Sequence, residues 1–182
     1  MVLARLTRIA PLNSRLARGM SAFEPRNRAW RERVRMSFDS QTFMSHLGAR
    51  LVSAAPGEVC IECDASPTLR QQNGYFHAGV TTSIADSAAG YAALTLFPEG
   101  TEVLTTELKI NLLRPAQGDR FVARGRVIKP GKALTVCQAD VYSVTVERVC
   151  EEALQQDEDG AGAAASEVHV ATLLLTMMQM QK

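Results

Sequence analysis

The run AGVTTSIADSAAGYAALTL at residues 78–96 decides the fold. Its apolar character, followed closely by Pro98 and Gly100, predicts one long helix that ends before the proline. Most of its side chains are those of alanine, glycine, serine and threonine. A helix with so little bulk cannot fill a core by itself, so we expect a β-sheet to approach it closely and wrap around it.

Four stretches after this helix have the character of strands. Residues 104–112 alternate apolar and polar side chains, which is typical of a strand with one buried face. Residues 120–128, 133–146 and 168–180 are the other predicted strands, and Pro130-Gly131 marks a turn between two of them.

Two strands and a helical region precede the long helix. Residues 50–54 and 58–64 are predicted strands joined by a turn at Pro56-Gly57. Residues 27–48 carry apolar side chains at helical spacing, and the polar residues at 37–40 indicate two short helices. This order of elements predicts an α+β fold in which one antiparallel sheet wraps around a central helix, and 182 residues suit a single domain.

Charge, hydropathy and cysteine spacing exclude several classes of function. A net charge of +1 gives no general attraction for nucleic acid, and no apolar run reaches the roughly 20 residues that span a bilayer. Among Cys60, Cys63, Cys137 and Cys150, the first two form a C-x-x-C pair within a predicted strand. A redox pair belongs at a helix start and a zinc site needs a second pair, so we predict reduced structural thiols and no metal.

Two segments lie outside the predicted core. Residues 1–23 contain four arginines and no acidic residue, with serine and small apolar residues between them. This composition is typical of a mitochondrial transit peptide, and the alternatives are a disordered basic tail or a true start at Met20. We therefore predict a mitochondrial protein, with the cytoplasm as the alternative. Residues 147–166 are acidic and rich in glycine and alanine, which predicts a flexible hairpin insertion in a domain at 24–182.

Asp86 is an unexpected residue on a helix that is otherwise apolar nearly all round. Burial of an unpaired carboxylate costs on the order of several kcal/mol, so such a group is usually paired or functional. The residues one helical turn away, among them Thr82, Ser83 and Gly90, are small or hydroxylic and leave room for a ligand. The alternative is that Asp86 bonds to Thr82, Ser83 or a neighbouring backbone and has only a structural role.

The long helix begins at His77-Ala78-Gly79. Backbone N–H groups at a helix start lack partners within the helix and stabilise negative charge. An oxyanion that forms at a carbonyl carbon would suit this place. For His77, a capping or packing role is the alternative.

Together these residues resemble a known family. The pattern Gln71-x-x-Gly74-x-x-His77-Ala78-Gly79, followed by Asp86-Ser87-Ala88-x-Gly90, resembles the signature of hotdog-fold thioesterases of the phenylacetate-degradation (PaaI-like) family. Residues 105–115 resemble the family's first strand after the helix, and the resemblance covers roughly residues 39–146 and the last strand. It implies a hotdog fold, an acyl-CoA substrate with no separate cofactor, and a homodimer or dimer of dimers with active sites between subunits.

The resemblance also implies the parts of a catalytic site. Asp86 would act as the nucleophile or as a general base on water, and the Ala78 N–H would bind the thioester oxygen. Gln71, or Asn73 as a second candidate amide, would position that oxygen or the water from the opposite subunit. Alanine at 78 stands where the family usually has glycine, and glutamine at 71 stands where asparagine is common.

Other roles rest on the same resemblance. His77 would orient the loop or bond near the thioester, and Gly79 would belong to the substrate-binding turn. Thr105 matches a hydroxyl that often assists from the next strand. In a regular strand Thr106 rather than Thr105 shares a face with Leu104, so this role requires a β-bulge.

Further residues are candidates for binding the substrate. The resemblance implies that the nucleotide of coenzyme A lies near the turn Lys129-Pro130-Gly131-Lys132, and the alternative is a pair of solvated lysines. Tyr75, Phe76, Tyr91 and Leu94 are candidates for lining an acyl pocket, and they fit a core equally well.

Two other functions remain open on the sequence. The first is a non-catalytic module that binds acyl-CoA. The second is a hotdog hydratase or dehydratase that uses His77 and Asp86 as an acid and base pair across an enoyl thioester. The surrounding pattern favours the thioesterase.

Overall fold

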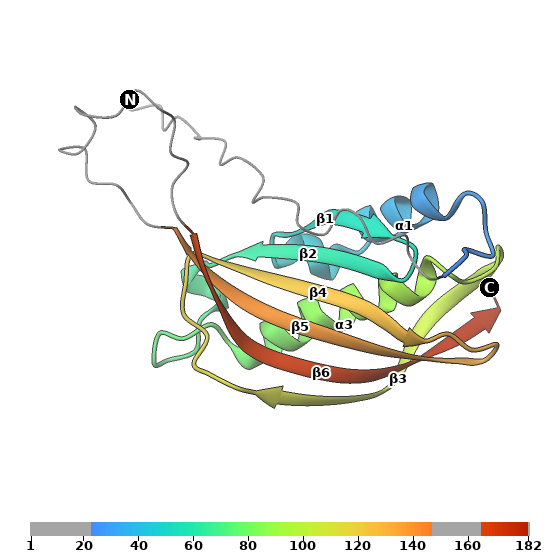
Figure 1. Ribbon diagram of the computed structural model, residues 1–182. Coiled ribbons are helices and arrows are strands. Elements are labelled where there is room, and N and C mark those ends of the chain that lie inside the picture. Colours follow the sequence, from blue (N-terminus) through green and yellow to red (C-terminus); the bar gives the residue numbers. More distant parts are fainter. Residues whose placement is uncertain (1–22, 147–164, 182) are drawn as a thin grey trace, which may run out of the picture.

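Helix α3 (Ala78–Leu94) lies against one face of a six-stranded antiparallel sheet that curves around it (Figure 1). The computed structural model describes residues 23–146 and 165–181. The strands are β1 (Ala49–Ala55), β2 (Glu58–Asp64), β3 (Thr101–Leu112), β4 (Arg120–Lys129), β5 (Leu134–Val146) and β6 (Ala165–Gln181), in the order β1-β2-β4-β5-β6-β3. Helices α1 (Trp30–Asp39) and α2 (Thr42–His46) precede the sheet, and a short 3-10 turn, η1 (Pro67–Leu69), precedes α3.

This architecture confirms the predicted α+β hotdog class and the predicted order of elements. Residues 27–48 form two short helices, as the polar residues between them indicated. Two strands begin three residues earlier than predicted: β3 begins at Thr101 and not at residue 104, and β6 begins at Ala165 and not at residue 168. The predicted transit peptide, apart from its last residue, and the predicted acidic insertion up to residue 164 lie outside the described residues.

Small side chains allow α3 to lie directly on the sheet. Ala85, Ala88, Ala89 and Ala92 are fully buried, and the glycine at position 125 of β4 meets the helix backbone. A Cβ atom added at Gly125 would overlap the backbone carbonyl of Ala88. The expected close approach of sheet and helix is therefore present, and it depends on glycine on one side and alanine on the other.

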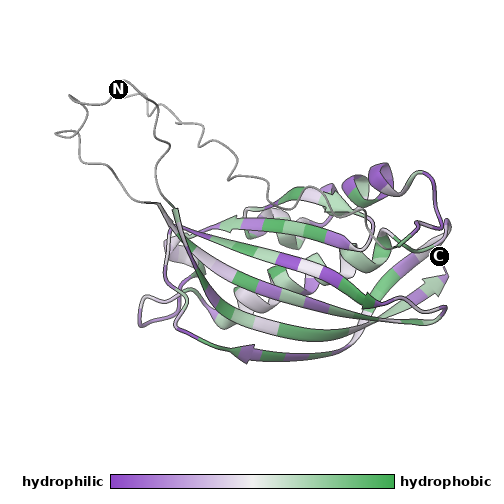
Figure 2. Ribbon diagram, viewed as in Figure 1, coloured by the Kyte–Doolittle hydropathy of each residue, from purple (hydrophilic) through white to green (hydrophobic). Residues whose placement is uncertain are grey.

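The core fills the space between the helices and the concave face of the sheet. Figure 2 shows hydrophilic and hydrophobic residues alternating along much of the sheet, as expected for strands with one face packed on a core. Trp30, Val34 and Phe38 of α1 close one side of this core. In the described part of the chain, no helix has both the length and the apolar character needed to cross a membrane.

The prediction that β3 has one buried face was wrong. Leu104, Leu108 and Leu112 are 50%, 42% and 58% exposed. Leu108 and Leu112 are exposed because β3 lies at the edge of the sheet, where it pairs with β6 alone among the described strands. Leu104 is exposed because a register shift between Thr105 and Glu107 places it on the other face of the strand. Alternation of apolar and polar residues along a sequence indicates that a strand has two different faces, but it does not show whether another element covers either face.

Three of the cysteines are buried and free, which confirms their prediction as structural thiols. Cys63 belongs to the main core, whereas Cys60 packs with Val122 and Val144 in a separate small cluster, so the C-x-x-C pair points to opposite faces of β2. Burial raises the pKa of both thiols to about 11 and that of Cys137 to about 12. Cys150 lies outside the described residues.

The contact between β4 and α3 leads to a stability prediction. Gly125→Ala places a methyl group in the backbone of Ala88, and no side-chain rotation can relieve that overlap. We expect a loss of about 1–3 kcal/mol in the free energy of unfolding, measured by urea denaturation. Gly90→Ala is the matched control, because its Cβ would lie 3.9 Å from Val103 and alanine favours a helix. Equal losses in both variants would contradict this account.

Candidate active site

His77 caps α3. It has an extended backbone, and its Nδ1 accepts a hydrogen bond from the Gly79 N–H at 2.8 Å. A Cβ atom at position 79 would lie 2.9 Å from the same nitrogen, so the cap requires glycine there. The capping role that the sequence left open for His77 is the one that the structure contains.

This cap leaves one backbone donor free at the start of the helix. The N–H groups of Val80 and Thr81 both bond to the His77 carbonyl, at 2.9 and 3.2 Å, and the Gly79 N–H bonds to the His77 ring. Among the described residues, the Ala78 N–H has no hydrogen-bond partner. Ala78 is the first residue of the helix, and its helical backbone conformation is one that any L-amino acid adopts. Alanine can therefore present its backbone N–H at this position as well as glycine can.

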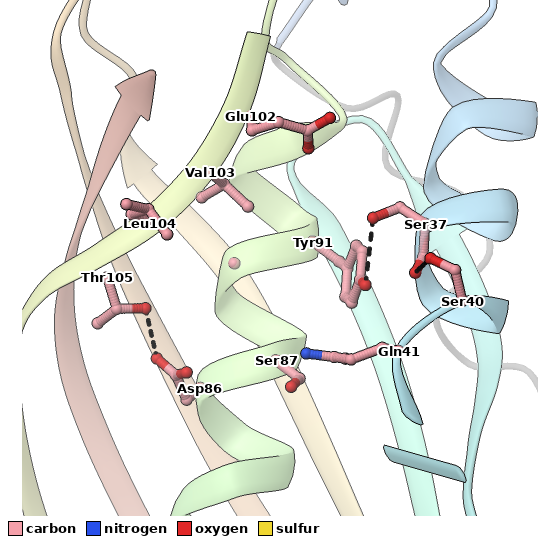
Figure 3. Close-up of a pocket in the computed structure, with 11 residues that line it drawn as sticks. Ser37, Ser40, Gln41, Asp86, Ser87, Tyr91, Glu102, Val103, Leu104 and Thr105 are labelled. Atoms are coloured by element: carbon pink, nitrogen blue, oxygen red, sulfur yellow. Dashed lines mark hydrogen bonds between the residues drawn. The ribbon is translucent and has the colours of Figure 1, made fainter. Parts of the chain in front are cut away.

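Asp86 lies in the middle of α3 and is half-buried. Its Oδ1 accepts a hydrogen bond of 2.7 Å from the Thr105 hydroxyl (Figure 3). Thr82 and Ser83, the alternative partners, donate instead to the carbonyl groups of Ala78 and Gly79. Burial raises the pKa of Asp86, and the bond from Thr105 lowers it by a smaller amount. The carboxylate is thus less stable as an anion than an exposed aspartate, and it keeps one fixed donor.

A β-bulge brings Thr105 to Asp86. Thr105 lies opposite Met177 of β6, and the next pair is Glu107 with Thr176, so Thr106 is the extra residue. Met177 is fully buried, which identifies its face as the one toward the helix. The bulge that the role of Thr105 required is therefore present, and it reverses which side chains of β3 face inward.

Asp86 and Thr105 open onto a cavity of about 480 Å³, a size suited to a small-molecule ligand. The lining comes from Ser37, Ser40 and Gln41 near α1 and α2, from Asp86, Ser87, Gly90 and Tyr91 of α3, and from Glu102, Val103, Leu104 and Thr105 of β3 (Figure 3). Among residues 23–146 and 165–181, no three His, Cys, Asp or Glu side chains are placed to hold a metal ion.

The two candidate amides lie elsewhere. Gln71 Oε1 accepts a bond of 2.8 Å from the Asn73 N–H, within a tight turn that includes Gly74 at φ 84°. Gln71 lines a second, more open hollow together with Tyr75 and residues 112–116. Neither amide lines the cavity that contains Asp86, so their catalytic roles stay predictions.

The predicted lining residues divide between pocket and core. Tyr91 lines the cavity beside Asp86, and Tyr75 lines the second hollow. Phe76 stacks on Phe121 with ring centroids 3.8 Å apart, and Leu94 is fully buried, so both belong to the core.

Helix geometry separates the free N–H from the carboxylate. Ala78 and Asp86 are eight residues apart in α3, which places them about 12 Å apart along its axis. A catalytic base must lie within roughly 3 Å of the group on which it acts. One thioester cannot therefore contact both residues of a single chain. His77, the N-cap, lies one residue further from Asp86 than Ala78 does, so one chain does not pair His77 and Asp86 as an acid and base either.

Lys129 and Lys132 are exposed at the connection between β4 and β5. This connection lies at the same end of the sheet as Thr105, because Thr105 is opposite Met177 and Met177 is opposite Thr135 at the start of β5. Neither lysine forms an ion pair with a described residue. Binding of a nucleotide by these lysines stays a prediction.

The sequence did not identify six residues of the cavity. They lie in segments whose patterns indicated only helix ends and a strand, and they are Ser37, Ser40, Gln41, Glu102, Val103 and Leu104. Packing of α1 and β3 against α3 brings them to Asp86, and no spacing within the chain reports that packing.

Comparison with known proteins identifies the family. Residues 73–150 match the model of the thioesterase superfamily. A thioesterase family protein from Silicibacter pomeroyi has a solved structure with 38% identity and a TM-score of 0.72, covering 84% of this chain and 99% of that one. Human acyl-coenzyme A thioesterase 13 is 29% identical over 113 residues, which are 61% of this chain and 80% of that protein.

The fold is also that of PaaI from Escherichia coli, with a TM-score of 0.65 at 18% identity, over 85% of this chain and 96% of that one. Alignments with the curated relatives span between 66% and 85% of the lengths of those proteins. This chain belongs to the thioesterase superfamily, a family of enzymes, and it has the hotdog fold. The resemblance inferred from residues 71–90 is confirmed at the level of family and fold.

The environment of Asp86 predicts a pH-dependent stability. Because burial raises its pKa in the folded state, ionisation of Asp86 destabilises the fold at neutral pH. This effect is absent below the ordinary aspartate pKa of about 4, where both states are protonated, and it grows as pH rises through the raised value. Asp86→Asn should therefore raise the melting temperature at pH 7, and the gain should shrink as the pH falls.

Asp64→Asn is the control of opposite sign. The hydrogen bond from Arg50, at 2.8 Å, lowers the pKa of Asp64, with a further contribution from Arg120. Its ionised form stabilises the fold at neutral pH and loses that effect as the pH falls through the lowered value. This variant should melt at a lower temperature than the wild type at pH 7, with a deficit that shrinks in acid. A gain from both substitutions would contradict these assignments.

Proposed function

We propose that this protein hydrolyses acyl-CoA thioesters to a free acid and coenzyme A. The observation that carries the proposal is a half-buried carboxylate, Asp86, with one fixed hydroxyl donor at a cavity large enough for an acyl group. The name of human acyl-coenzyme A thioesterase 13 supports the class of substrate. The substrate brings its own coenzyme A, and the reaction needs no separate cofactor.

In this reaction Asp86 acts on the thioester carbonyl. As a general base it takes a proton from water while the water oxygen attacks the carbonyl carbon, and as a nucleophile it attacks the carbon directly. Collapse of the tetrahedral intermediate breaks the carbon–sulfur bond and releases the coenzyme A thiolate. In the general-base route the proton held by Asp86 passes to this thiolate, and in the nucleophilic route water then hydrolyses the acyl–Asp86 anhydride to the free acid. Thr105 keeps one oxygen of Asp86 in a hydrogen bond, which orients the other oxygen toward the substrate.

The oxyanion donor comes from a second copy of the chain. The free Ala78 N–H and Asp86 are about 12 Å apart along α3, so one site needs the N–H of one subunit and the carboxylate of another. Gln71 or Asn73 accompanies that N–H as the positioning amide. His77 and Gly79 hold the helix start in place through their mutual bond.

The exposed edge of the sheet supports a homodimer. Strand β3 is long, lies at the edge, and exposes Leu108 and Leu112. An uncovered edge of this kind tends to pair with another strand, and two identical edges pair antiparallel about a twofold axis. On the other face of the sheet, Leu134 and Leu174 are each 52% exposed, which favours a dimer of dimers.

Coenzyme A and the cell compartment complete the proposal. Lys129 and Lys132 bind its phosphates, since both are exposed cations at the end of the sheet where Thr105 lies. The arginine-rich residues 1–23 direct the protein to mitochondria, with the cytoplasm as the alternative. Mass spectrometry of the N-terminus of the protein purified from its native cells would detect their removal.

The assay for this function is release of free thiol from a panel of acyl-CoA thioesters. We expect Asp86→Asn to lower kcat by about 10²–10⁴-fold, because its amide keeps the bond from Thr105 but cannot accept a proton. Thr105→Val should shift the acid limb of the pH profile upward, since the hydrogen bond from Thr105 lowers the pKa of Asp86.

Three outcomes would contradict the proposal. Equal rates of thiol release by the wild type and Asp86→Asn would exclude Asp86 as the catalytic group. Tight binding without turnover, seen as a raised melting temperature, would favour a non-catalytic acyl-CoA module. Loss of enoyl absorbance without thiol release would favour a hydratase.

A mixing experiment tests the shared site. Ala78→Pro removes only the proposed oxyanion donor, because proline is well tolerated at the first position of a helix and His77 already has the extended backbone that precedes proline. Ala78→Pro and Asp86→Asn are each expected to be nearly inactive. After unfolding and refolding together in equal amounts, about one quarter of the wild-type activity should return, because half of the dimers are mixed and one of their two sites is intact.

A control mixture contains Asp86→Asn and Thr105→Ala. Asp86 and Thr105 of one subunit belong to the same site. A mixed dimer of these two variants therefore contains no fully intact site, and its activity should not exceed the activity that Thr105→Ala contributes. Failure of the first mixture to exceed the sum of its components, although native mass confirms mixed dimers, would overturn the shared site.

A further inference from the structure

Ser87 carries an unpaired hydroxyl group at the wall of the cavity. The residue is 8% exposed, follows Asp86 directly in α3 and lines the same cavity. Its hydroxyl makes no hydrogen bond with any residue in the described part of the chain. Among the described side chains, the only unpaired oxygen or nitrogen that is closed to solvent is Oε1 of Gln41. The oxygen of Ser87 is therefore accessible to a ligand as well as unpaired.

The hydroxyl groups in the first half of α3 behave differently from that of Ser87. Thr81, Thr82 and Ser83 each donate to the carbonyl four residues earlier, at 3.5, 2.8 and 2.7 Å. A bond of this kind is the local partner that a helix offers to serine and threonine. Ser87 does not form it with the Ser83 carbonyl, so its hydroxyl is left for the cavity.

Gln41 supplies a second donor at this part of the wall. Figure 3 shows its amide extending from the connection between α1 and α2, with the nitrogen toward Ser87. This nitrogen has no hydrogen-bond partner among the described residues and is accessible, whereas Oε1 of the same amide is closed to solvent and takes no part in the site. An amide nitrogen only donates, and a serine hydroxyl can donate as well. The two groups together are suited to an acceptor oxygen.

The charge of the cavity restricts what that oxygen can belong to. The charged residues of the described lining are Asp86 and Glu102, and no lysine, arginine or histidine accompanies them. A carboxylate on the acyl group would be repelled by these two side chains. A neutral acceptor, such as the oxygen of a ketone, meets no such repulsion.

We propose that Ser87 is a specificity-determining residue that binds a keto oxygen on the acyl chain of the substrate, with the amide nitrogen of Gln41 as the second donor. The inference rests on the proposed thioesterase function and names a class of substrate for it. A carbonyl oxygen has two lone pairs, so it accepts from both donors at once. An unsubstituted alkyl chain would cover the same two groups and leave them without partners.

The position of Ser87 sets where this oxygen belongs along the acyl chain. Consecutive residues of a helix have Cα atoms about 3.8 Å apart and point about 100° apart around the axis. In the proposed reaction the thioester carbonyl lies at Asp86, so the atoms that reach Ser87 belong to the first part of the acyl chain. The keto oxygen is therefore expected on roughly the third to fifth carbon, counted from the thioester carbonyl.

The test measures thiol release from octanoyl-CoA and from its 3-oxo, 4-oxo and 5-oxo derivatives. For each variant, kcat/KM for a keto thioester is divided by kcat/KM for octanoyl-CoA, so the intrinsic reactivity of each thioester cancels when variants are compared. Ser87→Ala should lower the highest of the three wild-type ratios about ten-fold, because the hydroxyl donor is lost. Gln41→Met, which keeps the length of the side chain and removes the amide, should lower the same ratio.

Ser83→Ala is the matched control. It makes the same change one turn earlier in α3, where the hydroxyl bonds to the Gly79 carbonyl and does not line the cavity. This variant should keep the wild-type ratios. Equal ratios in the wild type and Ser87→Ala at all three keto positions would overturn the proposal. A lower ratio in Ser87→Ala together with a loss of native mass would also overturn it, because the hydroxyl would then serve the contact between subunits.

The two proposals fail in different ways. Hydrolysis of octanoyl-CoA with ratios that Ser87→Ala leaves unchanged contradicts the role of Ser87 alone. If no thioester is hydrolysed, the proposed function fails, and the rise in melting temperature caused by each intact thioester still tests Ser87. A larger rise with a keto thioester than with octanoyl-CoA in the wild type, lost in Ser87→Ala, would support the binding role, and equal rises would overturn it.

Discussion

The structure depends on the contact between Gly125 of β4 and the backbone of Ala88 in α3. Because neither residue has a side chain that could hold the two backbones apart, the sheet lies directly on the helix and curves around it. This closeness has two consequences. The alanines beside Ala88 become fully buried, and the next residues around the helix, Asp86 and Gly90, face the edge of the sheet where β3 passes. The site is therefore a product of the same packing that stabilises the fold.

The bulge in β3 adds the second constraint. It places Thr105 rather than Thr106 toward the helix, and it gives the only carboxylate of α3 a hydroxyl donor at 2.7 Å. Without it, Thr106 and not Thr105 would face the helix, and the observed bond between Thr105 and Asp86 would be lost. A local irregularity of one residue thus moderates the rise in the pKa of Asp86 that burial causes, at the group on which the proposed chemistry depends.

Most of the fold was predictable because its signals are local. The small-residue composition of residues 78–96, the turns at Pro56-Gly57 and Pro130-Gly131, and the alternation of the strands each report on a segment that needs no distant partner. The prediction was wrong where the burial of a side chain depends on an element that is distant in the sequence. The leucines of β3 alternate as if one face were buried, but their exposure depends on whether another chain or element covers an edge strand.

The sequence by itself determined the family, the central helix and the residues of its start and middle, since a carboxylate on an apolar helix and a capped helix start are visible in the order of residues. Only the tertiary structure decided how those residues are used. In the folded chain the Gly79 N–H bonds to the His77 ring, and the Ala78 N–H has no partner among the described residues. The bulge in β3 brings the Thr105 hydroxyl to Asp86, and the packing of α1 places Gln41 at the same cavity. The physical reason is that a hydrogen bond depends on distance and direction in space, and spacing along the chain fixes these only within one helix or turn.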